Sequence, residues 1–404
     1  MFKLAINLWY VASVKLSIIG GAGRVGLPLG LSFAKAGLSV TIIDSDTERV
    51  ELINQRKMPF IEKGAEEIIS NLSNDQLNAT SDYSGITGSD VCILVIGTAV
   101  NNDGIPESKF ISNFLCSISK YLTSTKLLIL RSTLYPGITD EVEKALKTEG
   151  LNILVAYCPE RIAEGNALEE MNALPQIIGV NSDEAYDLAL KVFSFINSNS
   201  IRTSFKEAEL SKLFANAYRY LNFAISNEFF KICINASVDW QNVWNAVKKD
   251  YPRATSLPVP GFASGPCLAK DTAQLYYHSE NSFHIGKVAT DINEGLPLFI
   301  VNHMQKLFDL SNLSIGILGM TFKGEVDDFR SSHSFQLKEI LEKISKKIYC
   351  SDEVLQKDYF VTPEVLIDKS DIIIISTPHL RYSKININKP IIDIWRTNVS
   401  PSLI

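Results

Sequence analysis

A cysteine in the second half of the chain lies in a sequence that favours nucleophilic chemistry. Cys267 follows Gly265-Pro266. Proline suits the first position of a helix, because the amide hydrogen that it lacks would have no partner there. A helix that begins here directs its positive dipole end at the sulfur and favours the thiolate. Asp271 follows one turn later, on the same face. The alternative is that Cys267 is a small buried apolar residue, which is the usual role of a cysteine.

A glycine-rich loop near the start of the chain predicts a dinucleotide site. The pattern G-x-G-x-x-G covers Gly21, Gly23, Arg24, Val25 and Gly26. Glycines let the backbone turn tightly and approach a pyrophosphate, whose charge lies at the start of the next helix. Asp44 ends the next apolar run, close to the expected distance of ~20 residues, where its carboxylate can accept from the ribose hydroxyls. The same carboxylate repels a 2′-phosphate, so the pattern favours NAD over NADP. The alternative is an ordinary tight turn between a strand and a helix.

Composition limits the class of protein. The 404 residues carry a net charge of −6 and are 46% hydrophobic, so we expect more than one domain, and neither nucleic acid nor an anionic membrane as the main partner. No apolar run reaches the ~20 residues of a membrane span. None of the six cysteines forms a C-x-x-C pair, which favours a reduced, cytoplasmic setting, and the five histidines predict no metal site. We interpret residues 1–14 as an N-terminal extension.

The order of apolar runs predicts an α/β fold. Short apolar runs alternate with helical stretches up to about residue 205, which indicates a parallel sheet covered on both faces. An all-helical segment follows, with one long helix over Glu207–Asn235, and strand-like runs return from Ser314. We therefore expect two Rossmann-like parallel-sheet domains joined by a helical domain with one long spine helix. The predicted domains are a dinucleotide-binding domain (1–205), a central helical domain (206–311) and a second α/β domain (312–404).

Six sequence blocks, in order, resemble the UDP-glucose/GDP-mannose dehydrogenases across nearly the whole chain. Their joint order and spacing are far more specific than any one block. The blocks are GAGRVGLPLG (21–30), RSTLYPGIT (131–139), CPERIAEG (158–165), ELSKLFANAYR (209–219), GPCLAKDT (265–272) and GMTFKGEVDDFRSS (319–332).

The resemblance implies an enzyme that oxidises the C6 hydroxymethyl of a nucleotide sugar to a carboxylate with two NAD⁺, for polysaccharide or glycan synthesis. It implies that Cys267 attacks the intermediate aldehyde and carries a thioester, which water hydrolyses. Lys212 and Asn216 would stabilise the oxyanion; they lie at i and i+4 of the long helix and therefore project from one face. The remaining implied catalytic residues are Asp271 and Thr133, which position the water, and Glu160, which assists hydrolysis as a base.

The resemblance also implies binding residues. On the cofactor side, besides the glycine loop and Asp44, these are Thr98, Thr133 and Arg330. On the substrate side, besides Lys212 and Asn216, they are Glu160, Arg161, Glu164, Arg253, Gly261 and Lys323. We expect a homodimer in which Arg253 reaches the sugar of the partner subunit. The alternative for Lys212 and Asn216 is a solvated helix face, and for the three cations Lys323, Arg330 and Arg253 it is an exposed surface.

The chain departs from the family pattern in three places without losing a catalytic group. Pro266 and Ala269 stand where the family often has glycine and proline, and Arg131 stands where it often has an acid. CPERIAEG resembles the branch that acts on UDP-N-acetylmannosamine or UDP-N-acetylglucosamine more than the UDP-glucose or GDP-mannose branches. Two rival functions stay open. One is a two-electron hydroxyacid dehydrogenase, which needs neither Cys267 nor residues 312–404. The other is a non-catalytic protein that binds nucleotide sugars.

Overall fold

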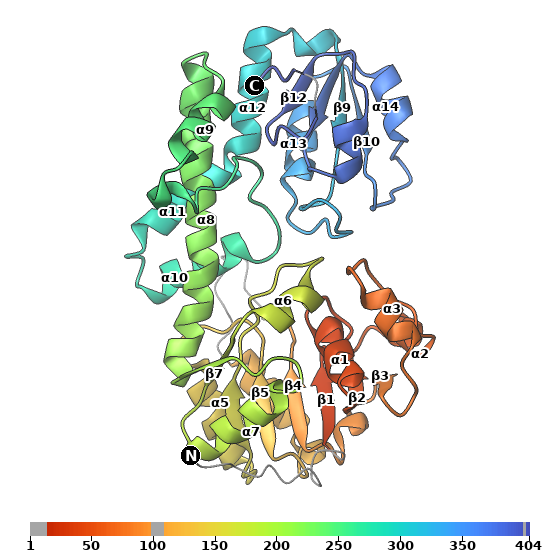
Figure 1. Cartoon of the computed structure of the whole chain (residues 1–404), viewed down its shortest axis with the longest axis vertical. Helices are drawn as coiled ribbons and strands as arrows, with labels where there is room; N and C mark the ends of the chain where they lie inside the picture. The colour runs from red at the N-terminus through yellow and green to blue at the C-terminus, as the bar shows by residue number, and fades with distance from the viewer. Residues whose placement is uncertain (1–13, 98–108, 399–400) are drawn as a thin grey trace. The chain divides into compact units, whose positions relative to one another are not determined.

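The computed structural model describes residues 14–97, 109–398 and 401–404, and strands alternate with helices in both halves of the chain (Figure 1). The chain divides into two units, residues 1–214 and 215–404, and the boundary falls within helix α8 (Phe205–Asn235). The predicted division into three domains at residues 205 and 311 stays a prediction. In the described residues, no helix is both long and apolar enough to span a membrane.

The first unit contains an eight-stranded sheet, with the order β3-β2-β1-β4-β5-β6-β7-β8 in the described residues. The strands are β1 (Lys15–Ile19), β2 (Ser39–Ile43), β3 (Leu77–Thr80), β4 (Val91–Leu94), β5 (Leu127–Leu130), β6 (Leu154–Tyr157), β7 (Gln176–Gly179) and β8 (Ser200–Thr203). The predicted parallel sheet is confirmed from β3 to β6. The β7–β8 pair differs from the prediction, because β7 runs antiparallel to β6.

Helices cover both faces of this sheet, as the continuous apolar strands require. Alternate residues of one strand enter different cores: Leu127 and Ile129 pack with residues of α1 (Gly26–Lys35) and α7 (Asp183–Phe193), whereas Leu128 and Leu130 pack with residues of α4 (Phe110–Ser117) and α5 (Ile138–Thr148). The helices before α8 are α1 (Gly26–Lys35), α2 (Thr47–Asn54), α3 (Ala65–Ser70), α4 (Phe110–Ser117), α5 (Ile138–Thr148), α6 (Ala167–Ala173) and α7 (Asp183–Phe193), with short 3₁₀ turns at Tyr83–Ile86 and Ser119–Tyr121.

The second unit begins with the predicted helical segment. After α8 come α9 (Trp240–Lys248), α10 (Leu268–His278), α11 (His284–Glu294) and α12 (Leu296–Leu307), with 3₁₀ turns at Pro252–Ala254 and Leu310–Asn312. Tyr220 and Ala224 of α8 pack against Ala289 of α11 in a small core of their own. Helices α11 and α12 are separated at Gly295, and Pro297 lies in the first turn of α12, where it is tolerated.

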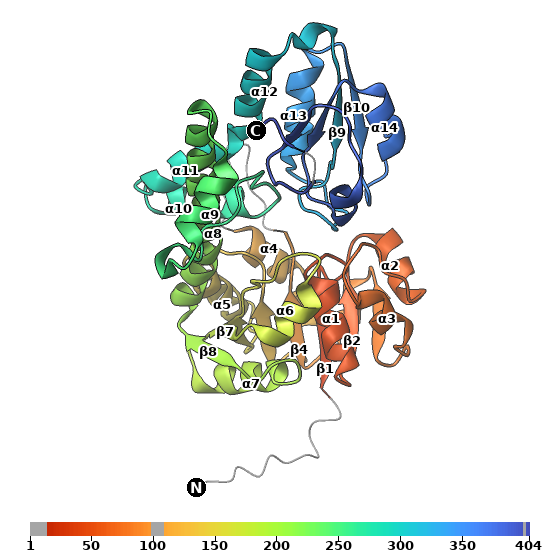
Figure 2. The ribbon, with the colours of Figure 1, turned by 45° about the horizontal axis from the view of Figure 1, so that its top comes forward.

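A four-stranded parallel sheet closes the chain, with the order β10-β9-β11-β12. Its elements are β9 (Ser314–Leu318), α13 (His333–Glu342), β10 (Lys347–Ser351), α14 (Pro363–Lys369), β11 (Ile372–Ile375), a 3₁₀ turn (Leu380–Lys384) and β12 (Ile391–Asp393). Figure 2 shows α13 and α14 on opposite faces of this sheet, which agrees with the two separate cores that they join. The order β10-β9-β11 repeats the order β2-β1-β4 of the first sheet, which agrees with the prediction of two Rossmann-like parallel-sheet domains.

Candidate active site

The glycine loop between β1 and α1 has the geometry that a pyrophosphate requires. Gly20 has a φ of 73°, and a Cβ there would lie 2.5 Å from the carbonyl oxygen of Val95. A Cβ on Gly26 would lie 2.6 Å from the Cα of Gly21, so the first turn of α1 packs directly on the loop. Around Gly23, by contrast, a Cβ would meet only the Gly20 carbonyl oxygen, at 3.6 Å. This open space suits the close approach of a phosphate.

Asp44 lies directly after β2, at the position predicted for the ribose acid. Its Oδ2 accepts the N–H of Ala22 in the glycine loop at 2.9 Å, and its Oδ1 accepts the N–H of Asp46 at 3.1 Å. The side chain is only half-buried, and each carboxylate oxygen has a second lone pair. Asp44 is therefore able to hold the loop and to accept from ribose hydroxyls. Thr98, the other predicted cofactor residue on this edge of the sheet, lies outside the described residues, as do residues 1–13 of the extension.

Arg24 joins the glycine loop to the loop that follows β6. Its guanidinium lies over the ring of Phe60, 5.0 Å from the centroid, and its Nε is 3.8 Å from Oε2 of Glu164. Both side chains of this ion pair are largely buried. Val25 precedes the first helical residue of α1. The predicted cofactor residue Arg24 and the predicted substrate residue Glu164 are thus in contact, within one unit of the chain.

Glu160, the predicted base, is surrounded by hydrogen-bond donors. Its Oε2 pairs with the buried guanidinium of Arg131, and its Oε1 accepts the N–H groups of Arg161 at 2.7 Å and Ile162 at 3.1 Å. The guanidinium of Arg161 donates to the carbonyl oxygen of Pro175. These contacts fix the direction of the carboxylate, and they explain why a cation suits position 131. The roles of Glu160 in hydrolysis and of Arg161 in substrate binding stay predictions.

Thr133 lies in the loop after β5, two residues beyond Arg131. It is half-buried, and its neighbour Ser132 donates through Oγ to the carbonyl oxygen of Ile96 at 2.6 Å. This bond ties the loop to the end of β4. Thr133 therefore belongs to the carboxyl edge of the first sheet, where ligands of open α/β sheets bind.

The predicted nucleophile is exposed at the start of a helix. Cys267 occupies the N-cap position of α10, so a helix begins after the Gly-Pro break as predicted, although Pro266 lies before the helix and not at its first position. Cys267 is the exposed cysteine among the six, of which four are buried. The alternative of a buried apolar residue is therefore wrong for Cys267. Asp271, one turn later, is fully buried and accepts from Nδ2 of Asn216 at 2.6 Å.

Lys212 and Asn216 lie one turn apart on α8 and are 8% and 6% exposed, so the alternative of a solvated helix face is wrong. In the part of the chain that the structure describes, the ammonium of Lys212 has no hydrogen-bond or ion-pair partner. A buried cation of this kind is able to meet a negative charge that develops during a reaction. The bond between Asn216 and Asp271 in turn holds an amide and a carboxylate one turn from the thiol.

The second unit also contains the predicted substrate cations Lys323 and Arg253 and the predicted cofactor cation Arg330. Lys323 lies in the loop after β9. Arg330 is exposed and forms a bidentate ion pair with Asp328, with Nη2 2.6 Å from Oδ2. Arg253 lies in the 3₁₀ turn Pro252–Ala254 and is exposed, 5.8 Å above the ring of Tyr251. Exposure leaves both arginines accessible, and their binding roles stay predictions.

Gly261 lies in the loop that leads to Cys267, and its predicted role in substrate binding stays a prediction. Its N–H donates to Oδ1 of Asn227 at 2.8 Å, and its carbonyl oxygen accepts from Nδ2 of the same side chain at 3.0 Å. A Cβ at Gly261 would lie 2.4 Å from the ring of Trp395. Both backbone polar groups are therefore engaged inside the fold, and Gly261 allows close packing of the tryptophan. The structure gives it a scaffold role in the loop that leads to Cys267.

Sequence reasoning missed two buried carboxylates that hold the loops of this site. Glu209 of α8 is fully buried and accepts the N–H groups of Gly137 and Thr139, both at 2.8 Å, at the start of α5. Glu62 accepts the N–H groups of Gly165 at 3.0 Å and Ala167 at 2.8 Å, at the start of α6. Glu209 stands three residues before Lys212 in its sequence block, which was a usable signal, whereas no motif marked Glu62.

Comparisons with known proteins agree with this geometry. The chain matches the models of the UDP-glucose/GDP-mannose dehydrogenase family for the NAD binding domain over residues 14–197, the central domain over 206–295 and the UDP binding domain over 316–398. No group of three or more potential metal ligands is found among the described residues.

Two archaeal relatives are similar over most of their length. A UDP-N-acetyl-D-mannosamine dehydrogenase of Pyrococcus horikoshii is 28% identical over 381 residues, which cover 91% of this chain and 90% of the relative. A protein of the same name from Methanococcus aeolicus is 30% identical over 380 residues, covering 91% and 85%. The solved structure of the UDP-D-ManNAc dehydrogenase from Pyrococcus horikoshii aligns with a TM-score of 0.88 at 25% identity, covering 96% of this chain and 97% of that one.

Proposed function

Because the chain belongs to the UDP-glucose/GDP-mannose dehydrogenase family, we propose that it oxidises the C6 hydroxymethyl of a nucleotide sugar to a carboxylate. The coarser activity, that of an NAD-dependent nucleotide-sugar dehydrogenase, follows from the family. The observation that carries the finer proposal is the exposed thiol of Cys267 at the start of α10, one turn from the bonded pair Asn216 and Asp271. A reaction that only removed one hydride from an alcohol would need no such thiol.

The proposed route passes through a covalent intermediate. Removal of a hydride and a proton converts the C6 alcohol to an aldehyde, and the thiolate of Cys267 adds to its carbonyl carbon. The resulting thiohemiacetal loses a second hydride and becomes a thioester. Water then cleaves the carbon–sulfur bond and gives the carboxylate and the free thiol. Bound NAD⁺ supplies the hydride acceptor for each oxidation.

Each of the predicted catalytic side chains has a role in this proposed route. The ammonium of Lys212 and the amide of Asn216 stabilise the oxyanion on C6, and the start of α10 favours the thiolate of Cys267. Asp271, held by Asn216, orients the water. We retain Glu160 and Thr133 as residues of the hydrolytic step, with Glu160 positioned by Arg131.

The described residues fit NAD at the carboxyl edge of the first sheet. The open space at Gly23 admits the pyrophosphate, and Asp44 has the capacity to accept from ribose hydroxyls. The family description of a UDP binding domain over residues 316–398 supports binding of the nucleotide by the second α/β region, where Lys323 lies. Arg330 remains a proposed cofactor contact.

We propose UDP-N-acetylmannosamine or UDP-N-acetylglucosamine as the sugar nucleotide. The sequence CPERIAEG and the names of the two archaeal relatives support this choice. UDP-glucose and GDP-mannose are the alternatives within the family. A non-catalytic binding protein is the alternative of another class, and the presence of Cys267, Lys212 and Asp271 argues against it.

A homodimer is part of the proposal, and α8 supports it. Five large hydrophobic side chains along α8 are 44% to 58% exposed at helical spacing: Phe214, Tyr218, Ile225, Phe229 and Ile232. Exposed apolar stripes of this kind mark protein interfaces, and a two-fold axis would pair the stripe with its own copy. We expect Arg253 to reach the sugar bound to the partner subunit. A cytoplasmic location remains a prediction.

The test is the amount of NADH formed per sugar consumed, with a panel of UDP- and GDP-sugars. We expect two NADH per sugar from the wild type and a sharp loss of carboxylate formation in Cys267→Ser. Cys116→Ser is the matched control, because Cys116 is a half-buried cysteine of α4 that is not among the predicted catalytic residues, so this variant should keep the wild-type activity. One NADH per sugar, with Cys267→Ser as active as the wild type, would contradict the covalent route. Binding of every sugar without turnover would support the non-catalytic alternative.

A further inference from the structure

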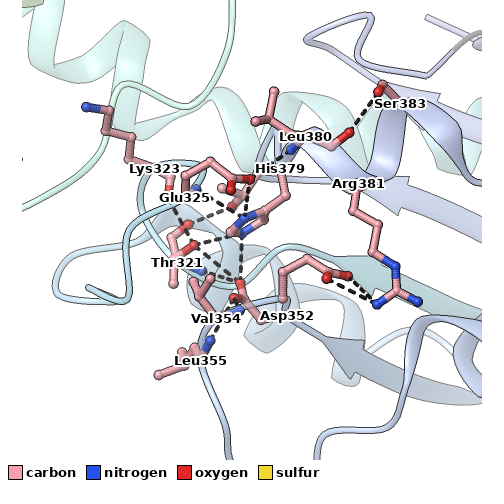
Figure 3. Close-up of polar contacts among 12 residues, drawn as sticks. Thr321, Lys323, Glu325, Asp352, Val354, Leu355, His379, Leu380, Arg381 and Ser383 are labelled. Carbon is pink, nitrogen blue, oxygen red and sulfur yellow. Dashed lines mark hydrogen bonds and ion pairs between the residues drawn. The ribbon is translucent and has the colours of Figure 1, made fainter. Parts of the chain in front are cut away.

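The segment that carries Lys323 is held from both sides by a buried histidine (Figure 3). His379, which follows β11, is fully buried, and its Nε2 lies 3.1 Å from Oγ1 of Thr321 and 3.3 Å from Oδ2 of Asp352. Its Nδ1 accepts the N–H of Glu325 at 3.2 Å. Thr321 and Glu325 stand two residues before and two residues after Lys323. One imidazole therefore fixes both ends of the five-residue segment 321–325.

Further contacts join this segment to the residues around His379. Oγ1 of Thr377 donates to the carbonyl oxygen of Thr321 at 2.6 Å, and the N–H of Leu380 donates to Oε1 of Glu325 at 2.9 Å. A Cβ on Gly324 would lie 2.4 Å from the carbonyl oxygen of Pro378, so the two backbones touch at the residue beside Lys323. Two loops from neighbouring strands, β9 and β11, are thus bonded along their length.

The hydrogen bonds determine which nitrogen of His379 carries a proton. Nδ1 accepts from a backbone N–H and is therefore unprotonated, so the neutral ring carries its hydrogen on Nε2. That hydrogen is directed at the oxygens of Asp352 and Thr321. Both nitrogens of the ring are engaged. A side chain with only an acceptor would lose the contact with Asp352 and Thr321, and one with only a donor would lose the contact with the N–H of Glu325.

Asp352 shows that this corner of the second sheet is a scaffold. It follows β10 as Asp44 follows β2, but it is almost fully buried and accepts four backbone N–H groups, those of Met320, Thr321, Val354 and Leu355, at 2.6 to 3.0 Å. Burial alone raises the pKa of Asp352, yet the hydrogen bonds from His379 and the backbone lower it to about 2. The carboxylate is therefore ionised and fully engaged. It holds the loop instead of a ribose.

We propose that His379 is a positioning residue for the nucleotide sugar, which acts by fixing Lys323 at the place where its ammonium meets the diphosphate. Figure 3 shows the side chain of Lys323 extending away from the buried cluster, as a residue held by its backbone and directed at a ligand would do. A lysine side chain is flexible, so its affinity for a diphosphate depends on how firmly its backbone is held. The inference rests on the proposed function, because it needs the diphosphate of a nucleotide sugar near Lys323.

The first experiment compares His379→Asn with the wild type. Asparagine keeps an acceptor near Nδ1 but loses the donor to Asp352. We expect the dissociation constant for UDP, measured by calorimetry, and the KM for the nucleotide sugar to rise about tenfold, a factor that corresponds to about 1.4 kcal/mol. The affinity for NAD and kcat should change less than about twofold, since neither depends on the UDP contact. His303→Asn, a half-buried histidine of α12 in the same unit, is the matched control.

A double-mutant cycle shows whether His379 acts through Lys323. Lys323→Ala should weaken UDP binding, and His379→Asn should add almost nothing to it, because the residue that it positions is gone. Additive losses would overturn the proposal, as would a His379→Asn enzyme that binds UDP as well as the wild type.

If His379→Asn does not fold, Thr377→Val removes a single bond to the segment and should raise the same KM about threefold, again without an effect in the Lys323→Ala background. A wild type that binds no UDP and oxidises no nucleotide sugar would instead contradict the proposed function.

Discussion

At the scale of single residues, buried carboxylates serve quite different purposes in this chain. Glu209 and Asp352 accept several N–H groups each, whereas Asp271 accepts from the amide of Asn216. Asp393, at the end of β12, is 1% exposed and accepts the N–H of Asn398 at 2.8 Å. Burial raises the pKa of such a carboxylate, and hydrogen bonds to it oppose that effect.

Asp393 should make the stability of the enzyme depend on pH. Burial, opposed by the hydrogen bond from Asn398, raises the pKa of Asp393 from 3.8 to about 6. A raised pKa in the folded state means that the stabilising contribution is present below about pH 4 and is lost as the pH rises through about 6. Such a change corresponds to about 3 kcal/mol at most. Asp393→Asn keeps the acceptor for Asn398 and removes the titration.

The measurement is urea unfolding of wild type and Asp393→Asn at pH 5 and pH 8. We expect the variant to gain stability relative to the wild type at pH 8 and to gain less at pH 5. Asp368→Asn, an exposed aspartate of α14, should leave the pH dependence unchanged. The same pH dependence in wild type and Asp393→Asn would show that this carboxyl does not titrate in the folded state near pH 6.

At the scale of secondary structure, Glu209 connects the start of α8 to the start of α5. Its carboxylate accepts from Gly137 and from both the N–H and Oγ1 of Thr139. The positive end of α5 favours this charge, although burial raises the pKa of Glu209. Lys212 lies one turn later on α8, so this contact also fixes the lysine relative to the loop of Thr133.

Glu209→Gln should therefore lower both stability and turnover. The amide of glutamine presents hydrogens to donors, and we expect a loss of about 1–3 kcal/mol in the free energy of unfolding. We also expect kcat to fall more than KM changes, because Lys212 acts on the developing oxyanion. Glu207→Gln is the matched control: Glu207 is exposed and only caps α8 through Ser204, so it should cost a few tenths of a kcal/mol. Equal effects of both variants on kcat would contradict a positioning role for Glu209.

The sequence predicted the elements whose signals are local. The alternation of strands and helices, the long helix up to Asn235 and the return of strands at Ser314 are all present in the structure. Edge strands such as β3 and β8 have weaker signals, because short edge strands with few apolar residues resemble loops. The prediction of the site has the same limit, because only the parts of it that lie close together in sequence leave a local signal.

Neighbours along the chain, such as Cys267 and Asp271, were foreseen from helical spacing. Contacts between distant segments, such as Glu62 with Ala167 and His379 with Asp352, were not, because only the folded topology brings these residues together. The contacts of Gly261 with Asn227 and Trp395 were not predicted for the same reason, because both partners are far away in sequence.

At the scale of the whole molecule, the two α/β halves use one topology for two purposes. In the first sheet, the acid after the second strand, Asp44, is half-buried and keeps capacity for a ligand. In the last sheet, the corresponding Asp352 is buried and bonded to His379. The two halves therefore share a strand order, but the acids at the matching position differ: Asp44 is able to accept from a ligand, whereas Asp352 holds the surrounding loops. This division agrees with the separate NAD binding and UDP binding family domains.

The proposed homodimer predicts that two inactive variants restore each other. If Arg253 serves the partner's sugar, Arg253→Ala and Cys267→Ser are each defective, but a mixed dimer combines the thiol of one chain with the arginine of the other at one of its two sites. Random reassortment makes half of the dimers mixed, so mixing equal amounts should restore about a quarter of the wild-type activity. The measurement is NADH formation before and after reassortment in mild urea.

A charge in the exposed stripe of α8, Phe229→Glu in both chains, should prevent reassortment and abolish the restored activity, whereas Val365→Glu, on an exposed position of α14, should not. Activity that stays at the level of the separate variants would mean that Arg253 acts, if at all, within its own subunit.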